Sequence, residues 1–234
     1  MDNKAAILST AAIADALVAK VNSAGMDIDV VPFISIAYLN DVPEIKDCAE
    51  KEINAVFTSS NAVEAVAKQI EGAECMKIFC VGNTTAALVK KHFGDKVLGV
   101  ADSAAELATL ILQFATIKEV TFFCGDNRRD ELPEMLGKTG VKVREVVVYE
   151  TTPTPKQVDK LYDGILFFSP SGVESFFSVN NIDEKTVLFA IGNTTGDALK
   201  QKTKNQIIVS EQPGKEQLAN AVIQYFTKAK QRKI

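Results

Sequence analysis

The residues of this chain that could do chemistry are mainly hydroxyl, glycine and amide residues in short loops that follow apolar runs. These segments are FTSS (57–60), VGNTT (81–85), CGDN (124–127), FSPSG (168–172) and IGNTT (191–195). At a helix start, free backbone N–H groups beside hydroxyls form a site for a carboxylate or phosphate. We therefore predict anion binding by Thr58, Ser59, Ser60, Gly82, Asn83, Thr85, Gly125, Ser169, Ser171, Gly192, Asn193 and Thr195. The alternative is that these serines and threonines only cap helices.

One tyrosine is a candidate for proton transfer. Tyr149 ends the apolar segment VREVVVY (143–149) and begins a linker that contains Pro153 and Pro155. At this position its hydroxyl would project into a cleft between two domains. The alternative is an aromatic residue that packs one domain against the other.

Other types of site are poorly supported. The single histidine, His92, looks like a favourable charge at a helix end. Cys48, Cys75, Cys80 and Cys124 form no CxxC pair, which is typical of reduced core thiols in a cytosolic protein. We therefore expect no metal site and no Ser/His/Asp triad. The P-loop and the dinucleotide-binding pattern GxGxxG are both absent from the sequence.

The elements that must position these loops are duplicated. Segment 55–65 (AVFTSSNAVEA) is similar to 164–174 (GILFFSPSGVE), and 78–85 (IFCVGNTT) is similar to 188–195 (LFAIGNTT). The offset is about 110 residues in both cases. A duplication of this kind predicts two similar halves that face each other across a cleft.

Apolar runs alternate with amphipathic stretches along most of the chain. Strands are expected at 5–9, 27–32, 78–81, 97–100, 121–124, 165–168, 187–191 and 207–209, and helices at 11–24, 62–70, 84–92 and 104–114. Ser59, Ser103 and Thr194 stand where N-caps would be. The order predicts an α/β fold of two similar, doubly wound parallel-sheet domains with helices on both faces. Ligands of such sheets bind beyond the carboxyl ends of the strands, where the loop Ser9-Thr10 would join the other loops.

The second copy ends before its last strands, and the N-terminal residues supply them. We therefore predict a circularly permuted repeat. Residues 1–33 and 156–234 form a discontinuous domain, 42–148 form an inserted domain, and 34–41 and 149–155 are extended connectors. The active site is expected in the inter-domain cleft.

Composition agrees with a soluble globular protein of two small domains. The formal net charge is −4 and 47% of the residues are hydrophobic. Such a balance argues against general nucleic-acid binding and against a polybasic membrane tether. The sequence has no apolar run of about 20 residues and no signal peptide. The basic residues near the C-terminus are read as a solvated tail: Lys228, Lys230, Arg232 and Lys233.

Several segments together resemble the uroporphyrinogen-III synthase family. They are FTSSNAVEA (57–65), GDNRRDELPEMLGKTGVKVREVVVYETTP (125–153), FFSPSGVESFF (167–177) and AIGNTTGDAL (190–199). The resemblance extends from Lys4 to Phe226. It implies two α/β domains with the active site in the cleft and no metal or organic cofactor.

The resemblance also implies an activity in heme biosynthesis. The substrate would be hydroxymethylbilane, a linear tetrapyrrole with eight carboxylates. The enzyme would close it to uroporphyrinogen III, with inversion of the last pyrrole ring and loss of water. Because the substrate also closes alone to the uninverted isomer, catalysis would work largely by orientation. A cytoplasmic monomer with at most transient contact with the preceding pathway enzyme is expected.

By the same resemblance, individual residues acquire expected roles. Tyr149 would assist departure of the substrate hydroxyl. The residues expected to hold substrate carboxylates are Thr85, Thr195, Ser59, Ser169 and Ser171.

The chain departs from the family in one loop. The family often has an arginine soon after its first strand, whereas this chain has Ser9-Thr10-Ala11-Ala12 there. In this chain, hydroxyl and amide groups would have to take the place of that arginine. Alternatively, Arg128 or Arg129 would take its place. Those two arginines are equally read as a solvated helix start.

Two other classes of protein stay open. A two-lobed α/β protein could bind an anionic small molecule without catalysis, which turnover of hydroxymethylbilane would exclude. A flavodoxin-like response module is disfavoured, because it would need acidic residues at strand ends that here carry serine, threonine and glycine.

Overall fold

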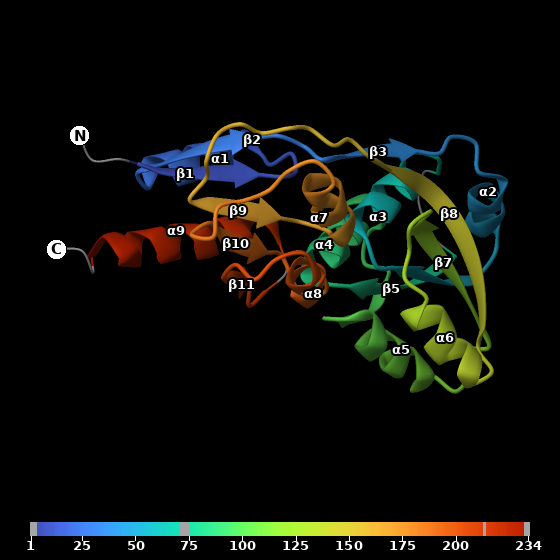
Figure 1. Ribbon diagram of the computed structural model, residues 1–234. Coiled ribbons are helices and arrows are strands. Elements are labelled where there is room, and N and C mark those ends of the chain that lie inside the picture. Colours follow the sequence, from blue (N-terminus) through green and yellow to red (C-terminus); the bar gives the residue numbers. More distant parts are fainter. Residues whose placement is uncertain (1–3, 71–74, 213, 232–234) are drawn as a thin grey trace. The chain divides into compact units, whose positions relative to one another are not determined.

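The computed structural model describes residues 4–70, 75–212 and 214–231 (Figure 1). The chain divides into two compact units. Unit 1 consists of Met1–Ser35 and Thr152–Ile234, and unit 2 consists of Ile36–Thr151. Of the predicted basic tail, Arg232 and Lys233 lie outside the described residues.

Unit 2 is built on a sheet with the strand order β3-β8-β7-β4-β5-β6. Its strands are β3 (Ile34–Tyr38), β4 (Ile53–Phe57), β5 (Met76–Val81), β6 (Val97–Ala101), β7 (Glu119–Gly125) and β8 (Lys142–Pro153). Its helices are α2 (Pro43–Glu50), α3 (Ser60–Ala67), α4 (Asn83–Phe93), α5 (Ala104–Leu112) and α6 (Glu131–Lys138). From β8 to β6 all neighbouring strands are parallel. The parallel sheet that we predicted from the alternation of strands and helices is therefore present in unit 2.

Unit 1 is built on a sheet with the order β11-β10-β9-β1-β2, and its strands are also parallel. These strands are β1 (Ala5–Ser9), β2 (Met26–Val30), β9 (Gly164–Phe167), β10 (Val187–Ala190) and β11 (Ile207–Val209). The helices are α1 (Asp15–Ser23), α7 (Pro170–Phe177), α8 (Asn193–Lys202) and α9 (Lys215–Gln231).

The two sheets repeat one topology. Strands β9, β10, β11, β1 and β2 of unit 1 take the positions that β4, β5, β6, β7 and β8 take in unit 2. Because the N-terminal segment supplies the last two strands of unit 1, the repeat is circularly permuted. The predicted fold class, two similar parallel α/β sheets, is confirmed.

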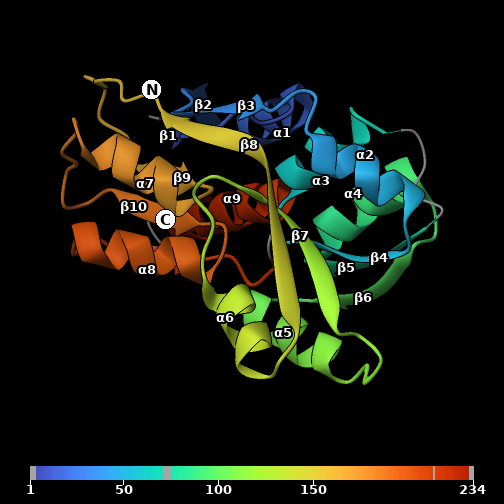
Figure 2. The same cartoon turned by 90° about the vertical axis from the view of Figure 1, so that its right-hand side faces the viewer.

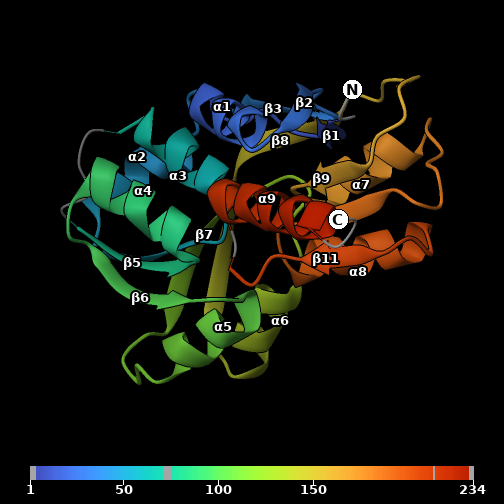
Figure 3. The same cartoon turned by 90° about the vertical axis from the view of Figure 1, so that its left-hand side faces the viewer.

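Successive residues of the central strands alternate between two hydrophobic clusters. In β4, Ala55 and Phe57 pack with α2, α3 and α4, whereas Val56 packs with α5 and α6 (Figure 2). In β9, Phe167 packs toward α7 and α8, whereas Leu166 packs toward α1 and α9 (Figure 3). Side chains alternate with period two along a strand, so helices cover both faces of each sheet. This burial fixes the register and hence which loops meet at the carboxyl edge.

Two of the three predicted N-caps are confirmed. The Ser59 hydroxyl accepts the Asn61 N–H at 3.1 Å, and the Ser103 hydroxyl accepts the Glu106 N–H at 3.2 Å. The prediction for Thr194 is wrong, because α8 already begins at Asn193 and its N-cap is Gly192. Gly192 has an extended backbone, with φ −173°, and is the last residue before the helical turn.

The structure also differs from the prediction around residues 34–50 and 149–153. Strand β8 continues past Tyr149 to Pro153, and residues 34–38 form strand β3. The Thr151 N–H donates to the Asp126 carboxylate at 2.9 Å, so a side chain replaces a backbone partner beyond Tyr149. Helix α2 was not predicted, because its main buried apolar side chains are Ile45 and Cys48. Two such residues are too few to give a helical pattern in the sequence.

Candidate functional site

Tyr149 lies at the carboxyl edge of the unit 2 sheet, next to the first turn of α3. Its hydroxyl donates to the Ser59 Oγ at 3.3 Å. The same Oγ accepts the Asn61 N–H as the N-cap of α3. Ser59 therefore caps a helix and also orients the phenol.

A glycine under the ring fixes the position of Tyr149. Gly125 is paired with Tyr149 across β7 and β8, where the register shifts. A Cβ atom at Gly125 would lie 2.5 Å from the Cζ of the tyrosine. The Asp126 N–H also donates to the Tyr149 carbonyl at 3.1 Å. Only glycine allows the ring to lie this close to the strand end.

The surroundings of Tyr149 keep its hydroxyl protonated. Burial raises the pKa of Tyr149, and the hydrogen bond with Ser59 opposes that shift without cancelling it. Negative charge on Asp126 would raise this pKa further. Since the ordinary value is 10.0, the phenol is a hydrogen-bond donor at neutral pH.

The two Gly-Asn-Thr-Thr segments each begin a helix whose N-cap is a glycine. Gly82 precedes α4 and Gly192 precedes α8, and neither provides a side-chain cap. Gly82 has φ +79°, which favours glycine. Thr85 and Thr195, in the first turns of these helices, are buried, with 5% and 2% of their surface exposed. These two helix starts are better suited to an external anion than the serine-capped α3.

The loops after β1 and β9 meet at the carboxyl edge of unit 1. The Ser169 Oγ accepts the Gly172 N–H at 3.1 Å as the N-cap of α7. The buried Thr10 hydroxyl donates to the Leu166 carbonyl at 2.8 Å. A Cβ at Gly172 would lie 3.4 Å from the Ser169 Oγ and 3.9 Å from the Thr10 Oγ1. The two hydroxyls are therefore close to one point on this edge.

The predicted site residues fall into two groups, one in each unit. In unit 2, Tyr149 is in direct contact with both Ser59 and Gly125. The other unit 2 residues lie after β4 and β5 at the same edge: Thr58, Ser60, Gly82, Asn83 and Thr85. The unit 1 residues lie after β9 and β10: Ser169, Ser171, Gly192, Asn193 and Thr195.

The cations near these edges differ from the prediction. Arg128 is bound to Glu145 and Asp130, and its side chain is only 26% exposed, so it is neither a solvated residue nor an available cation. Lys215 was not predicted, yet its Nζ donates to the Ala12 carbonyl in the loop after β1. A lysine in the first turn of a helix is an unusual placement, since acidic residues are favoured there, and that is the signal the sequence offered.

The cysteines and the histidine have no catalytic arrangement. All four cysteines are free. Burial raises the pKa of Cys80 to about 12 and that of Cys124 to about 11, so neither is a thiolate at neutral pH. His92 lies in the last turn of α4, with its Nε2 3.4 Å from the Glu64 carboxylate. In the described part of the chain no His, Cys, Asp and Glu side chains cluster as metal ligands, and no helix is long and apolar enough to cross a membrane.

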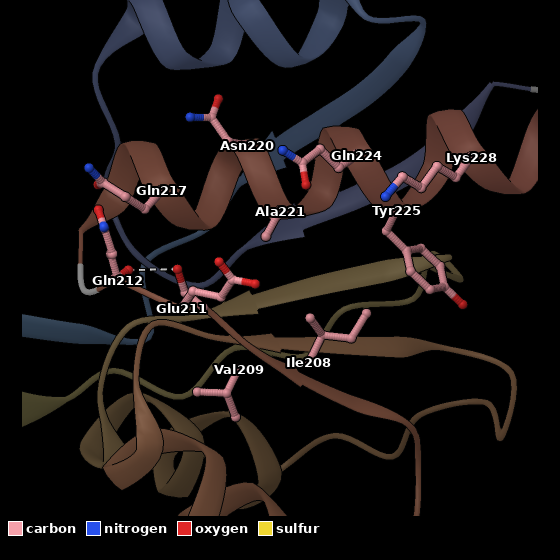
Figure 4. Close-up of a pocket in the computed structure, with 11 residues that line it drawn as sticks. Ile208, Val209, Glu211, Gln212, Gln217, Asn220, Ala221, Gln224, Tyr225 and Lys228 are labelled. Atoms are coloured by element: carbon pink, nitrogen blue, oxygen red, sulfur yellow. Dashed lines mark hydrogen bonds between the residues drawn. The ribbon is translucent and has the colours of Figure 1, made fainter.

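A cavity of about 390 Å³ lies away from the predicted residues, between β11 and α9 of unit 1. Figure 4 shows amide side chains along α9 on one side and apolar strand residues on the other. Its amide and charged lining residues are Glu211, Gln212, Gln217, Asn220, Gln224 and Lys228. Its lining includes one acidic residue, Glu211, and one basic residue, Lys228. It includes none of the residues predicted to bind anions.

Curated relatives agree with the sequence resemblance. Uroporphyrinogen-III synthase from Saccharomyces cerevisiae is 27% identical over 175 residues, which cover 63% of this chain and 64% of that protein. Uroporphyrinogen-III synthase from Schizosaccharomyces pombe is 26% identical over 205 residues, covering 78% and 79%. The chain thus spans a little under two thirds of the first relative.

Solved structures show the same fold. A mutant uroporphyrinogen III synthase from Thermus thermophilus matches with a TM-score of 0.67 at 17% identity, covering 97% of this chain and 99% of that one. The enzyme from Helicobacter pylori matches with a TM-score of 0.63 at 17% identity, covering 95% and 100%.

The model of the uroporphyrinogen-III synthase HemD family matches residues 15–220. This range is most of the chain and includes Tyr149 and all the residues predicted to bind anions. The chain therefore belongs to the uroporphyrinogen-III synthase family.

Proposed function

We propose that this protein closes hydroxymethylbilane to uroporphyrinogen III, with inversion of the last pyrrole ring and loss of water. The observation that supports this most is the half-buried, protonated phenol of Tyr149, hydrogen-bonded to Ser59 at the carboxyl edge of unit 2. Family membership supports the activity, and the phenol supplies a group that can perform its first step.

In that step the C–O bond of the substrate hydroxymethyl group breaks, and the oxygen leaves with the electron pair. The pyrrole N–H of the same ring loses its proton, so that water is lost overall and an azafulvene remains. Ring closure then passes through a spiro intermediate before the rearrangement. Tyr149 stabilises the charge that develops on the leaving oxygen.

The surroundings of Tyr149 favour hydrogen bonding over complete proton transfer. Burial raises the pKa of the phenol and so disfavours the phenolate that proton transfer would leave. The present hydrogen bond to Ser59 is long, at 3.3 Å, and therefore weak. The phenol hydrogen can therefore turn to a substrate oxygen at little cost, while Ser59 beside it still restrains the position of the phenol.

The remaining predicted residues bind carboxylates in this proposal. The glycine-capped starts of α4 and α8 offer backbone N–H groups and the hydroxyls of Thr85 and Thr195. Such local dipoles suit a polyanion even though the chain has a net charge of −4. The reaction needs no metal or organic cofactor. We also propose that the protein acts as a cytoplasmic monomer and takes its unstable substrate from the preceding enzyme by transient contact.

An isomer assay tests the activity. Freshly generated hydroxymethylbilane is supplied, the products are oxidised, and isomers I and III are separated by chromatography. We expect mostly isomer III, in an amount that depends on the protein. Isomer I alone, at the rate seen without protein, would instead support a protein that binds an anionic ligand without catalysis.

A further inference from the structure

Lys215 stands at the carboxyl edge of unit 1, where the loops after β1 and β9 meet. It is the first residue of α9, and its Nζ donates to the Ala12 carbonyl at 2.7 Å. The same Nζ lies 6.0 Å from the ring centroid of Phe168, the residue that follows β9. The ammonium group thus lies near the loops that follow β1 and β9.

The ammonium group has unused hydrogen-bonding capacity. A lysine has three N–H donors, and within the described residues only the Ala12 carbonyl accepts from Lys215. No described carboxylate lies within ion-pair distance of it, whereas Lys202 in the same unit pairs with Glu174 at 2.6 Å. Two donors and a full positive charge therefore remain for a ligand.

Helix stability does not explain this position. A cation in the first turn of a helix faces the positive end of the helix dipole, which is unfavourable. The surrounding protein also lowers the pKa of Lys215, although the residue keeps an exposed surface. A bound anion would offset both costs.

We propose that Lys215 binds a carboxylate of the substrate at the carboxyl edge of unit 1. This rests on the proposed function, which supplies a polycarboxylate as the ligand. Arg128 is already bound to Glu145 and Asp130, and the loop after β1 contains no basic residue. Lys215 therefore supplies the positive charge at this edge that the loop after β1 lacks.

The test compares Lys215→Met and Lys215→Arg with Lys228→Met. Lys228 is an exposed lysine on the same helix, 13 residues on, or about 20 Å along its axis. The probe for binding is uroporphyrin III, a stable octacarboxylate followed by fluorescence, and turnover of hydroxymethylbilane gives KM and kcat. We expect Lys215→Met to raise Kd and KM roughly fivefold while kcat stays within about twofold. Lys215→Arg should restore most of the affinity, and Lys228→Met should behave as the unchanged protein.

Two results would overturn the proposal. One is an unaltered Kd and KM for folded Lys215→Met, checked by its melting temperature and by Lys215→Gln as a second variant. The other is an equal loss in Lys228→Met, which would show a general effect of charge. If the unchanged protein binds uroporphyrin but makes no isomer III, the proposed function fails while the Kd comparison still decides on Lys215. If it binds no uroporphyrin, the proposal for Lys215 fails too.

Discussion

The two units share one sheet topology but differ in the side chains at the carboxyl edge. In unit 2, strand β8 brings Tyr149 to that edge, where its hydroxyl meets Ser59. The corresponding strand of unit 1 is β2, and the chain beyond it leads to Phe33. Phe33 is fully buried, with its ring centroid 5.0 Å from that of Phe176. Unit 2 thus has a phenol hydroxyl at this position, whereas unit 1 has a phenylalanine that is part of its hydrophobic core.

This difference bears on the roles that we propose for the two units. Both units keep a serine-capped helix and a glycine-capped helix at the edge, so both can bind anions. Unit 2 adds the Tyr149 phenol, a hydrogen-bond donor suited to a leaving hydroxyl, and unit 1 has Lys215 at its edge instead. On the proposed function, the loops that the two units share would bind carboxylates, and Tyr149 of unit 2 would act on the leaving hydroxyl.

The largest effect is expected from Tyr149→Phe, which removes the phenol but keeps the ring against Gly125. We expect kcat to fall by about 100-fold or more, because a positioned proton or hydrogen-bond donor contributes at least that much. Tyr225→Phe in unit 1 is the matched control, since that hydroxyl donates to the exposed Gln206, away from the carboxyl edge of its unit. Unchanged turnover of Tyr149→Phe in the isomer assay would remove Tyr149 from the mechanism.

A methyl group at Gly125 should act next most strongly. The added Cβ would lie 2.5 Å from the tyrosine ring, so Gly125→Ala must displace the phenol. We expect a loss of isomer III and a decrease of about 1–3 kcal/mol in the free energy of unfolding. Gly137→Ala is the control: nothing lies within 4 Å of its Cβ, and in a helix interior it should stabilise by about 0.5–1 kcal/mol. Equal activity of the two variants would contradict the close packing of Tyr149.

Ser59→Ala and Ser169→Ala probe two corresponding residues of the units. Each removes an N-cap and should cost about 1 kcal/mol of stability, measured by denaturant unfolding. Ser59→Ala should also lower kcat by about two- to tenfold, because Tyr149 loses the partner that orients it. Ser169→Ala should change KM instead. A common effect on kcat would show that the two serines have the same task.

The smallest effects concern two acidic residues on the corresponding strands β2 and β8. Asp29 is bound by Lys160 and Tyr162, and Glu145 by Arg128. Asp29→Asn should cost about 0.5 kcal/mol, because the Asp29–Lys160 pair is 43% and 49% exposed. Glu145→Gln should cost more, about 1–2 kcal/mol, because the Arg128 pair is less exposed.

Denaturant unfolding as a function of pH checks the Asp29 contribution. The hydrogen bond from Lys160 lowers the pKa of Asp29 below its ordinary value of 3.8. The stabilisation is therefore fully present above about pH 3.8 and is lost as the pH falls through the lowered value. A difference between Asp29→Asn and the unchanged protein that persisted well below that pH would contradict this assignment.

Much of the fold could be predicted from local patterns. The duplicated segments and the alternation of apolar runs give the two parallel sheets, because both signals lie within short windows. Ser59 and Ser103 are found as caps by the same local rule. Helix α2 escapes prediction because few of its side chains are apolar, and the strand after Tyr149 does so because Asp126, a distant residue, supplies its partner.

The site could be predicted only in part. The loops are found because hydroxyls and glycines stand after strands, yet the contact of Tyr149 with Ser59 joins residues 90 positions apart. This contact depends on the register of β4, β7 and β8, which local sequence patterns do not reveal. The contact of Lys215 with Ala12 joins residues 203 positions apart, so the sequence offers only the indirect signal of a lysine in the first turn of a helix.

The decisive experiment on the division of labour between the units measures kcat and the uroporphyrin Kd on the same two variants, Tyr149→Phe and Lys215→Met. The predicted result is a crossed pattern, in which Tyr149→Phe loses kcat and keeps Kd, while Lys215→Met keeps kcat and loses affinity. If both variants changed the same parameter, the two carboxyl edges would share one task, and the proposed division of labour would be contradicted.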